Sequence, residues 1–307
     1  MFFSSCTIPF SHEIDYKSVP RFDVDSAYGI LRDFVAIGPR VPNTAQHDSA
    51  RQFIVSYLES LGYKPYLQQF TVFRFDSVPL HLTNIIVITN PQAKKHILLF
   101  THWDSRFIAD RDSDYFTHPQ PVLGANDGGS GTAVLLQIAK ILRQKPVKGY
   151  SIDFAFFDGE DQGPVGQTST KTLKYWSLGC RYWVKHKPAD YKPFIAIGVD
   201  MVGYKHAKFE MDGCSKFYNG YVLKQIWKIA ANLGYDTLFI NHPSLGRFNS
   251  HVVLSQQGKI RSVMIMENIP GQIYGSYWHT SHDSLQIISK KTLKAVGQTL
   301  VTAIYNL

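Results

Sequence analysis

Two adjacent acids follow an apolar run in the stretch FAFFDGEDQG, which occupies positions 154–163. The run 154–157 has the composition of a buried strand, and Glu160 and Asp161 come shortly after it. Adjacent side chains on an extended backbone point in opposite directions, so these carboxylates can perform two different functions in one cleft. A solvated strand end is the alternative interpretation, and it holds unless other segments supply partners.

Residues of the same chemical kind follow other apolar runs of the chain. HILLFT is followed by His102, GAND ends in Asp127 and precedes GGSG, FIAIGVD ends in Asp200, and SYWHTS contains His279. Ligands of open α/β sheets bind outside the carboxyl ends of the strands, where such side chains meet. The pattern therefore predicts one site built from separate segments.

Imidazole and carboxylate groups together are typical ligands of zinc, and a catalytic zinc has three protein ligands and an open position. Asp127, Asp161 and His279 would provide one such site. The glycines after Asp127 would permit a tight turn and close approach of backbone or substrate. Glu160 would then lie beside the metal without binding it, as a general acid or base.

The elements that must position these residues alternate between helix and strand, which predicts an α/β fold with helices on the faces of a sheet. No repeat, low-complexity tract or linker interrupts the pattern. We expect an N-terminal extension over 1–24 and a single catalytic domain over 25–307. The predicted helices cover 25–36, 46–61, 130–142, 221–233 and 291–305, and the predicted strands cover 84–89, 96–101, 151–157, 194–200 and 262–266.

Composition excludes several classes of function. The chain has 307 residues and a formal net charge of +8, with Lys and Arg spread along it, so we expect no nucleic-acid partner. No apolar stretch approaches the ~20 residues that span a bilayer. The start, MFFSSCTIPF, lacks a complete signal peptide. A removed export signal would place the protein in the periplasm or outside the cell, and the compartment stays open.

The cysteines Cys6, Cys180 and Cys214 lack the spacing of a zinc motif. A disulfide between Cys180 and Cys214 and two buried free thiols are equally compatible with the sequence.

The order of motifs HWDSR, GANDGGSG, FFDGEDQG, GVDMVG and YWHT resembles the zinc-dependent glutaminyl-peptide cyclotransferases, especially the bacterial members related to the animal enzymes. The segments GPRVPNT at 38–44 and LGCRYW at 178–183 are also similar to these glutaminyl cyclases. The resemblance extends from about Asp25 to the C-terminus. The family shares its fold with the zinc aminopeptidases.

The resemblance implies a three-layer α/β/α sandwich with a central twisted mixed sheet. It implies one zinc ion bound by Asp127, Asp161 and His279, with Glu160 as proton shuttle. It also implies Asp200 in a hydrogen-bonded acid network beside Glu160. It further implies that Trp278 lies in the substrate pocket. We also expect the protein to be a monomer. The reaction of the family converts N-terminal glutamine of peptides or proteins to pyroglutamate and releases ammonia.

One segment departs from the family. Where two acids are expected before a histidine, the chain has RFNSH, so Asn249 and Ser250 replace them. Asn249 occupies a position of the proton network, but an amide cannot relay a proton as a carboxylate does. A catalytically weakened, cyclase-fold binding protein is therefore one alternative. A di-zinc aminopeptidase is another, in which His102 and Asp200 bind a second metal.

Neighbouring residues have supporting roles in this interpretation. Asp104 is expected to orient His102 or a nearby loop, Arg106 to tie the loop to an acid, and Asp283 to fix the loop that holds His279. Tyr274 and Tyr277 either line the pocket or pack beneath it. Loops over 108–122 and 162–177 are long enough to shape the site.

Overall fold

The computed structural model describes residues 13–113, 118–166, 169–269 and 274–307. Cys6 and the first part of the expected N-terminal extension lie outside these residues. The helices and strands are α1 (Val24–Val35), α2 (Ala45–Ser60), β1 (Tyr66–Phe73), β2 (Pro79–Val87), β3 (His96–His102), α3 (Gly131–Gln144), β4 (Ser151–Phe157), α4 (Leu178–His186), β5 (Ile195–Asp200), β6 (Phe209–Met211), α5 (Gly213–Asn232), β7 (Phe239–Pro243), α6 (Ser250–Gln256), β8 (Ser262–Met266) and α7 (Lys290–Tyr305). Short helical turns η1 (Ala125–Ser130), η2 (Leu173–Tyr175) and η3 (Leu285–Ile287) connect them.

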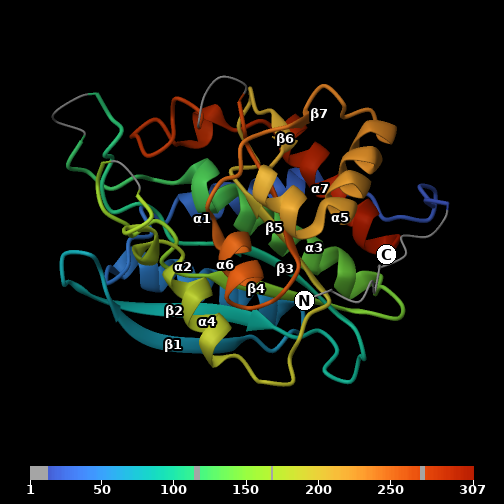
Figure 1. The fold of residues 1–307 in the computed structure, drawn as a ribbon, viewed down its shortest axis with the longest axis horizontal. Helices are drawn as coiled ribbons and strands as arrows, with labels where there is room; N and C mark the ends of the chain where they lie inside the picture. Colours follow the sequence, from blue (N-terminus) through green and yellow to red (C-terminus); the bar gives the residue numbers. More distant parts are fainter. Residues whose placement is uncertain (1–12, 114–117, 167–168, 270–273) are drawn as a thin grey trace.

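The central sheet has six strands in the order β1-β2-β4-β3-β5-β8 (Figure 1). Strands β4, β3, β5 and β8 are parallel, whereas β2 runs antiparallel to both of its neighbours. The sheet is therefore mixed, as expected. Parallel strands covered on both faces read as continuous apolar runs, and the sequence predicted all four of them, together with the part of β2 that pairs with β4.

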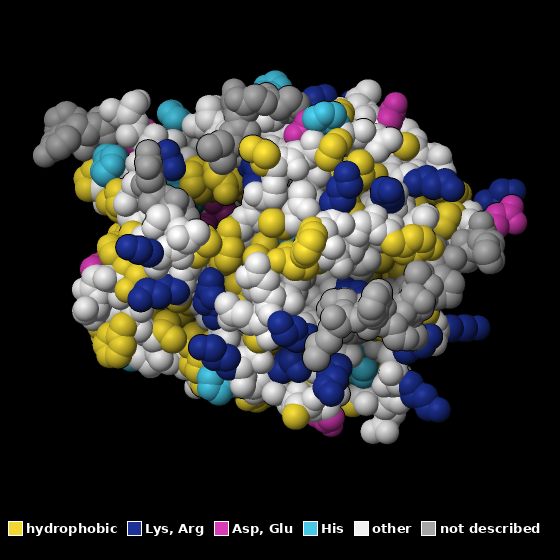
Figure 2. Space-filling model, in the orientation of Figure 1, with side chains coloured by type: hydrophobic (Ala, Val, Ile, Leu, Met, Phe, Trp, Pro, Cys, Tyr) yellow, Lys and Arg dark blue, Asp and Glu magenta, His cyan; other side chains and the backbone are white. Residues whose placement is uncertain are grey.

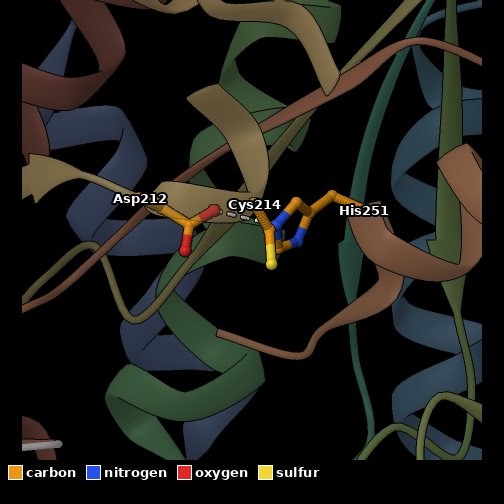
Figure 3. Close-up of side chains that lie close together, drawn as sticks. All are labelled: Asp212, Cys214 and His251. Atoms are coloured by element: carbon orange, nitrogen blue, oxygen red, sulfur yellow. Dashed lines mark hydrogen bonds and ion pairs between the residues drawn. The ribbon is translucent and has the colours of Figure 1, made fainter. Parts of the chain in front are cut away.

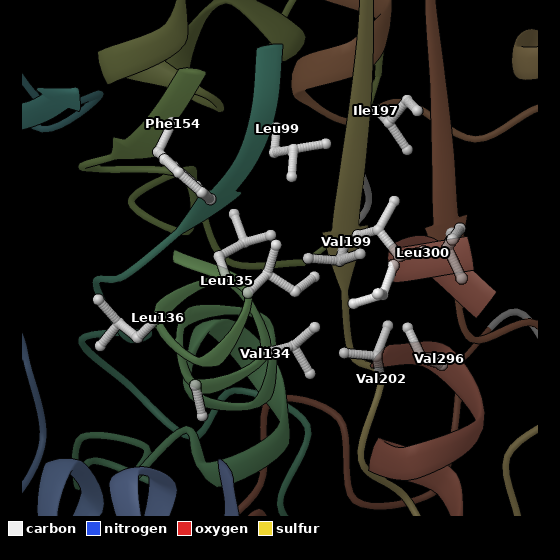
Figure 4. Close-up of a cluster of buried hydrophobic side chains, with 14 of the residues drawn as sticks. Leu99, Val134, Leu135, Leu136, Phe154, Ile197, Val199, Val202, Val296 and Leu300 are labelled. Atoms are coloured by element: carbon white, nitrogen blue, oxygen red, sulfur yellow. The ribbon is translucent and has the colours of Figure 1, made fainter. Parts of the chain in front are cut away.

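Successive residues of β3 alternate between the two faces of the sheet. Ile97 and Leu99 pack in the larger core, against helices that include α3 and α7 (Figure 4), while Leu98 and Phe100 pack in the second core. The second core includes residues of α4 and α6, such as Trp183 and residues 253–254. Helices thus cover both faces, and the three-layer α/β/α fold is confirmed.

Strand β3 lies between β4, which follows it in the chain, and β5, which comes next. The chain therefore leaves β3 toward one side of the sheet and later returns to its other side. Such a reversal opens a crevice at the carboxyl ends of the strands. The segments that carry the candidate site all begin at this edge.

Several elements differ from the expectations. Helix α5 begins at Gly213 rather than at 221, and a kink at Asn219 (φ −155°, ψ 60°) separates its first turns from the predicted part. Strand β1 and the start of β2 were not predicted, since β1 is an edge strand, the start of β2 pairs with β1 alone, and both have exposed positions. Cys180 and Cys214 are both free thiols, so the disulfide alternative is wrong.

The surface agrees with a dispersed basic charge, because Lys and Arg side chains are scattered over the face shown in Figure 2. Among the described residues, no helix combines the length and the apolar character needed to cross a bilayer.

The buried Arg40 connects the segment 38–44 to the edge that carries the site. Its side chain is fully buried and donates hydrogen bonds to the carbonyl oxygens of Trp103 (2.8 Å), Leu123 (2.7 Å) and Gly124 (2.7 Å). Burial lowers the pKa of Arg40 to about 10, so the guanidinium remains charged at neutral pH. It therefore joins the end of β3 to the turn that precedes Asp127.

We expect Arg40→Met to destabilise the fold by about 3–5 kcal/mol, because buried carbonyl groups lose their donor and water cannot replace it. Urea unfolding followed by circular dichroism measures this change. Arg32→Met, at an α1 side chain that is 63% exposed, is the control and should shift stability by no more than about 0.5 kcal/mol. Equal effects of the two substitutions would contradict the role of Arg40.

Candidate metal centre and substrate pocket

The structure brings Asp127, Asp161 and His279 together, although they come from three separate segments. Asp127 lies in η1, Asp161 follows β4, and His279 lies in the loop after β8. One potential ligand atom of each residue lies within 4.8 Å of those of the other two, and all three side chains are buried. That these residues bind zinc stays a prediction, but their predicted proximity is observed.

The donor set fits a metal ion. His279 Nε2 lies 3.7 Å from Asp127 Oδ2 and 3.8 Å from Asp161 Oδ1, too far for hydrogen bonds. His279 Nε2 and Asp161 Oδ2 are buried without a hydrogen-bond partner. Unpaired buried polar atoms are costly, and a cation between them would satisfy them. One imidazole and two carboxylates are suitable ligands for zinc.

A second group, His102, Asp127 and Asp200, shares Asp127 with the first. Its atoms already bond to one another: His102 Nε2 lies 3.0 Å from Asp127 Oδ1 and 3.2 Å from Asp200 Oδ1. Burial alone would lower the pKa of His102, but the Asp200, Asp104 and Asp127 carboxylates raise it well above its usual value. The polar atoms of the second group therefore have hydrogen-bond partners within the group, whereas some polar atoms of the first group have none.

Two glycines permit the close packing around Asp127. Gly128 has φ +75°, and a Cβ atom there would lie 2.6 Å from the carbonyl oxygen of Asp104. At Gly131, the first residue of α3, a Cβ atom would lie 2.2 Å from Thr101 Oγ1. The expected tight turn and close backbone approach are both present.

The carboxylate of Asp104 fixes the backbone of the two adjacent acids, Glu160 and Asp161. It accepts hydrogen bonds from the backbone N–H groups of Glu160 (3.0 Å) and Asp161 (3.3 Å) and from Gln162 Nε2 (2.9 Å). Its Oδ1 also lies 3.3 Å from His102 Nδ1. Asp104 therefore orients both His102 and the loop after β4, as the sequence predicted.

Arg106 and Asp283 tie other parts of the site together. Arg106 forms the predicted ion pair with an acid, Asp110, whose Oδ1 lies 3.3 Å from His279 Nδ1. Asp283 accepts hydrogen bonds from the backbone N–H groups of Asn126 (2.7 Å) and Asp127 (3.0 Å). The backbone N–H of Asp283 also donates to the carbonyl oxygen of Thr280 (3.2 Å), so the predicted turn hydrogen bond in the loop of His279 is present, and the carboxylate in addition fixes the turn of Asp127.

Glu160 points away from its neighbour Asp161 and is held by two hydroxyl groups. Ser177 donates to Glu160 Oε1 and Ser250 donates to Glu160 Oε2, each at 2.5 Å. Burial raises the pKa of Glu160 to about 7, against the lowering effects of His102 and the two hydroxyls. A carboxyl group with such a pKa can both accept and donate a proton at neutral pH.

Asn249 contacts Asp200, which places it in the predicted network. Its Nδ2 donates to Asp200 Oδ2 at 2.8 Å, while Asp200 Oδ1 lies next to His102. Both oxygens of Asp200 are thus engaged, and among the described residues no hydrogen bond joins Asp200 to Glu160. The expected proton sharing between these two acids is therefore not direct in this structure.

Left-handed backbone conformations are concentrated around these acids. His279 (φ 57°), Met201 (φ 48°), which follows Asp200, and Ser177 (φ 55°) all have positive φ without being glycine. Each such residue costs of order 1–3 kcal/mol and persists only where its surroundings enforce it. The three candidate segments are therefore held in a defined geometry by their packing.

A pocket of about 540 Å³ opens onto the acids. Its lining includes Glu160, Asp200, Trp176, Tyr274 and Trp278. Tyr274 stacks on Trp278 with ring centroids 4.0 Å apart. The space-filling view shows acidic atoms at the bottom of a hollow bordered by hydrophobic side chains (Figure 2). Trp278 therefore has the position of a substrate contact.

The two tyrosines beside Trp278 have different roles. Tyr274 lines the pocket. Tyr277 is buried beneath it and donates a hydrogen bond to Glu267 Oε2 at 2.6 Å. The sequence left two alternatives open, and Tyr274 lines the pocket whereas Tyr277 packs in the interior.

Asp212, Cys214 and His251 form a further group outside the pocket lining (Figure 3). Asp212 accepts hydrogen bonds from the backbone N–H groups of Ser215 (2.6 Å) and Arg247 (2.8 Å), and it lies 3.0 Å from His251 Nε2. Its oxygens are therefore occupied in capping α5 and fixing the segment 247–251. This group positions the loop that carries Asn249 and Ser250.

Comparison with known proteins places these features in a family. The chain matches the model of Peptidase family M28 over residues 84–304. It is 37% identical to a glutaminyl cyclase of Bacteroides thetaiotaomicron whose structure contains bound N-acetylhistamine, covering 94% of this chain and 100% of that one with a TM-score of 0.91. It is 38% identical to a Zn-dependent exopeptidase of Parabacteroides distasonis, with the same coverage and TM-score.

The fold is that of the Zn-dependent exopeptidase and glutaminyl cyclase structures, and the chain is an enzyme of the M28 superfamily. The chain belongs to peptidase family M28. The resemblance to glutaminyl cyclases is confirmed. Glutaminyl-peptide cyclotransferase of Drosophila melanogaster is 33% identical over 131 residues, which cover 40% of this chain and 33% of that protein. The match thus spans a third of that relative's length.

Some residues of the site escaped sequence analysis. Trp176 and Ser177 lie in the loop 162–177, which was expected to shape the site, but neither was singled out. Ser250 was noted only as a missing acid, whereas its hydroxyl contacts Glu160. Arg111 and Arg247 also line the pocket. A motif comparison cannot find such residues, because their roles depend on contacts between distant loops.

We expect Asp161→Asn to abolish metal binding, because it removes a negatively charged ligand from the group Asp127, Asp161 and His279. Metal content of the purified variant, measured by inductively coupled plasma mass spectrometry, provides the test. Glu160→Gln is the matched control at the adjacent position and should retain metal. Zinc retained by the Asp161 variant at the wild-type level would overturn the assignment.

Proposed function

We propose that this protein is a glutaminyl-peptide cyclotransferase that converts N-terminal glutamine of peptides or proteins to pyroglutamate, with 25–307 as the catalytic domain. The observation that carries the proposal is the contrast between the two donor groups. His279 and Asp161 have unpaired buried atoms, whereas His102 and Asp200 are already paired with neighbours. This contrast favours one metal ion, as expected for a cyclase, over the two of the aminopeptidase alternative.

Asp127, Asp161 and His279 would hold the zinc ion. Bound there, zinc would supply Lewis-acid chemistry that polarises the γ-amide carbonyl of the substrate. The pocket beside it is lined by the indole of Trp278, which offers an apolar wall to the glutamine side chain. Holding the amine and the amide of one residue close together supplies a large part of the rate in an intramolecular ring closure.

Glu160 is placed to move the proton that the reaction requires. The substrate α-amine forms a bond to the γ-carbonyl carbon, and the bond from that carbon to the amide nitrogen breaks. Glu160 accepts a proton from the attacking amine and returns it to the leaving nitrogen, which departs as ammonia. The Ser177 and Ser250 hydroxyls fix the carboxylate in one orientation for both transfers.

Asp200 and Asn249 have a positioning role in this scheme. The amide of Asn249 donates a hydrogen bond to Asp200 Oδ2 and so fixes the orientation of that carboxylate. Asp200 Oδ1 then holds His102 in place beside Asp127. Although Asn249 stands where an acid is expected, it still contacts Asp200. Ser250, at the other expected acid position, contacts Glu160, in addition to the contact from Ser177.

The product of a Gln-initiated peptide tests the proposal. We expect ammonia and a pyroglutamyl peptide, detected by a coupled ammonia assay and mass spectrometry. Release of free glutamine with the shortened peptide would identify an aminopeptidase instead. Binding of the peptide without either product would identify a non-catalytic protein.

In the same assay, Glu160→Gln should lower kcat by at least ~10²-fold, the usual contribution of a positioned acid–base group. KM should change little, since the loss falls on the transition state. Unchanged kcat would remove Glu160 from the mechanism. The metal content of this variant shows whether the loss arises from proton transfer or from a disrupted metal site.

Asn249→Asp addresses the alternative of a weakened enzyme. The new carboxyl group would face Asp200 at the position of the present 2.8 Å contact, where the two acids must share a proton. We expect this added acid to raise kcat by up to about tenfold, through a second titrating group beside the site. A lower or unchanged kcat, with wild-type metal content, would show that the amide is the better neighbour for Asp200.

A further inference from the structure

Two arginines line the pocket that contains the candidate catalytic acids, and the proposed mechanism uses neither. The guanidinium carbon of Arg111 lies 5.2 Å from the ring centroid of Trp278, and that of Arg247 lies 4.7 Å from the ring centroid of Tyr274. Because Trp278 and Tyr274 stack on each other, both arginines contact one aromatic wall.

The arginines lie nearer to solvent than the acids do. Glu160 and Asp200 are buried, Arg247 is half-buried and Arg111 is exposed. The backbone positions of both arginines are fixed, since Arg111 N–H donates to the carbonyl oxygen of His279 at 3.1 Å and Arg247 N–H donates to Asp212. The two arginines are therefore the more exposed charged groups of the pocket lining.

The aromatic wall also places Arg111 close to the candidate metal centre. Trp278 stacks on His279 with ring centroids 3.7 Å apart, and Tyr274 lies on the same wall. The aromatic contact of Arg111 is therefore a single ring away from a candidate metal ligand. An extended peptide advances about 3.3–3.6 Å per residue, so the residue after the N-terminal glutamine would lie along this wall.

Stacking prepares an arginine to bind a carboxylate. The N–H groups of a guanidinium lie in its plane, so a guanidinium packed against an aromatic ring, as that of Arg247 is against Tyr274, is held in an orientation from which it donates sideways to a carboxylate. Arg247 is fixed further, since it donates a hydrogen bond to Asn268. Charge-assisted hydrogen bonds of this kind are about twice as strong as neutral ones.

The negative charge of the acids in the pocket lining indicates what these arginines can do. Asp127, Glu160, Asp161 and Asp200 line its floor, so an acidic peptide would be repelled if no positive side chain lay nearby. We propose that Arg111 and Arg247 form a carboxylate subsite that selects peptides with an acidic residue directly after the N-terminal glutamine. This inference rests on the proposed function, because it names the substrate class of the same site.

Two matched peptides test the subsite: Gln-Glu-Ala-amide and Gln-Gln-Ala-amide, which differ only in the charge of the second residue. We expect wild-type kcat/KM, measured by ammonia release at low ionic strength, to be about tenfold higher for the glutamate peptide. The difference should lie mainly in KM and should shrink as salt is added. Equal values for the two peptides would overturn the subsite while leaving the cyclase proposal in place.

Variants assign the preference to the two residues. The double variant with Arg111→Gln and Arg247→Gln should reduce the ratio of kcat/KM for the glutamate peptide to that for the glutamine peptide to about one. Arg111→Gln alone, at an exposed position, should reduce this ratio in part. Arg143→Gln is the charge-matched control, because Arg143 lies in the last turn of α3, remote from the carboxyl edge, and should keep the wild-type ratio. A ratio that persists in the double variant would contradict the proposal.

Calorimetric binding separates this inference from the proposed function. If neither peptide releases ammonia, the proposed function fails, and the dissociation constants of the same two peptides then decide the subsite. Tighter binding of the glutamate peptide by about tenfold, lost in the double variant, would support the carboxylate subsite. Equal dissociation constants would overturn it.

Discussion

The carboxylate of Asp104 is the contact on which the arrangement of the site depends. It is fully buried, and it binds the backbone N–H groups of the two adjacent acids while facing His102. Backbone hydrogen bonds to both residues fix the direction in which each side chain leaves the chain. Glu160 can then face the hydroxyls of Ser177 and Ser250 while Asp161 faces His279.

This arrangement concentrates negative charge in a buried volume, and the surrounding fold compensates for it. Buried charges persist where they are paired or hydrogen-bonded. His102 lies between Asp127 and Asp200, Arg106 pairs with Asp110, and Arg40 binds the backbone of the turn before Asp127. Asp161 and His279 retain unpaired atoms, so the metal site is defined by what the remaining contacts leave unsatisfied.

The sequence predicted the parts that follow from local pattern. Apolar runs marked the parallel strands, and the polar residues after them marked the edge where Asp127, Asp161, Asp200 and His279 converge. Expectations that required contacts between distant segments were less successful. The contacts of the Asp283 carboxylate with the turn of Asp127 were not foreseen, and the hydroxyls on Glu160 were missed, because no spacing rule relates position 160 to 177 or 250. Helix α5 was predicted too short, since its kink at Asn219 interrupts the helical pattern.

The paired state of Asp200 has a consequence for how members of this superfamily are told apart. All the side chains needed for two metal ions are present, yet His102 and Asn249 occupy the oxygens of Asp200. An inventory of ligand residues would therefore assign the same chemistry to a ring-closing enzyme and to a hydrolase. The difference between them would lie in the neighbours of the ligands. Divergence between the two activities would then require changes at amide and hydroxyl positions, while the acids and histidines themselves stayed constant.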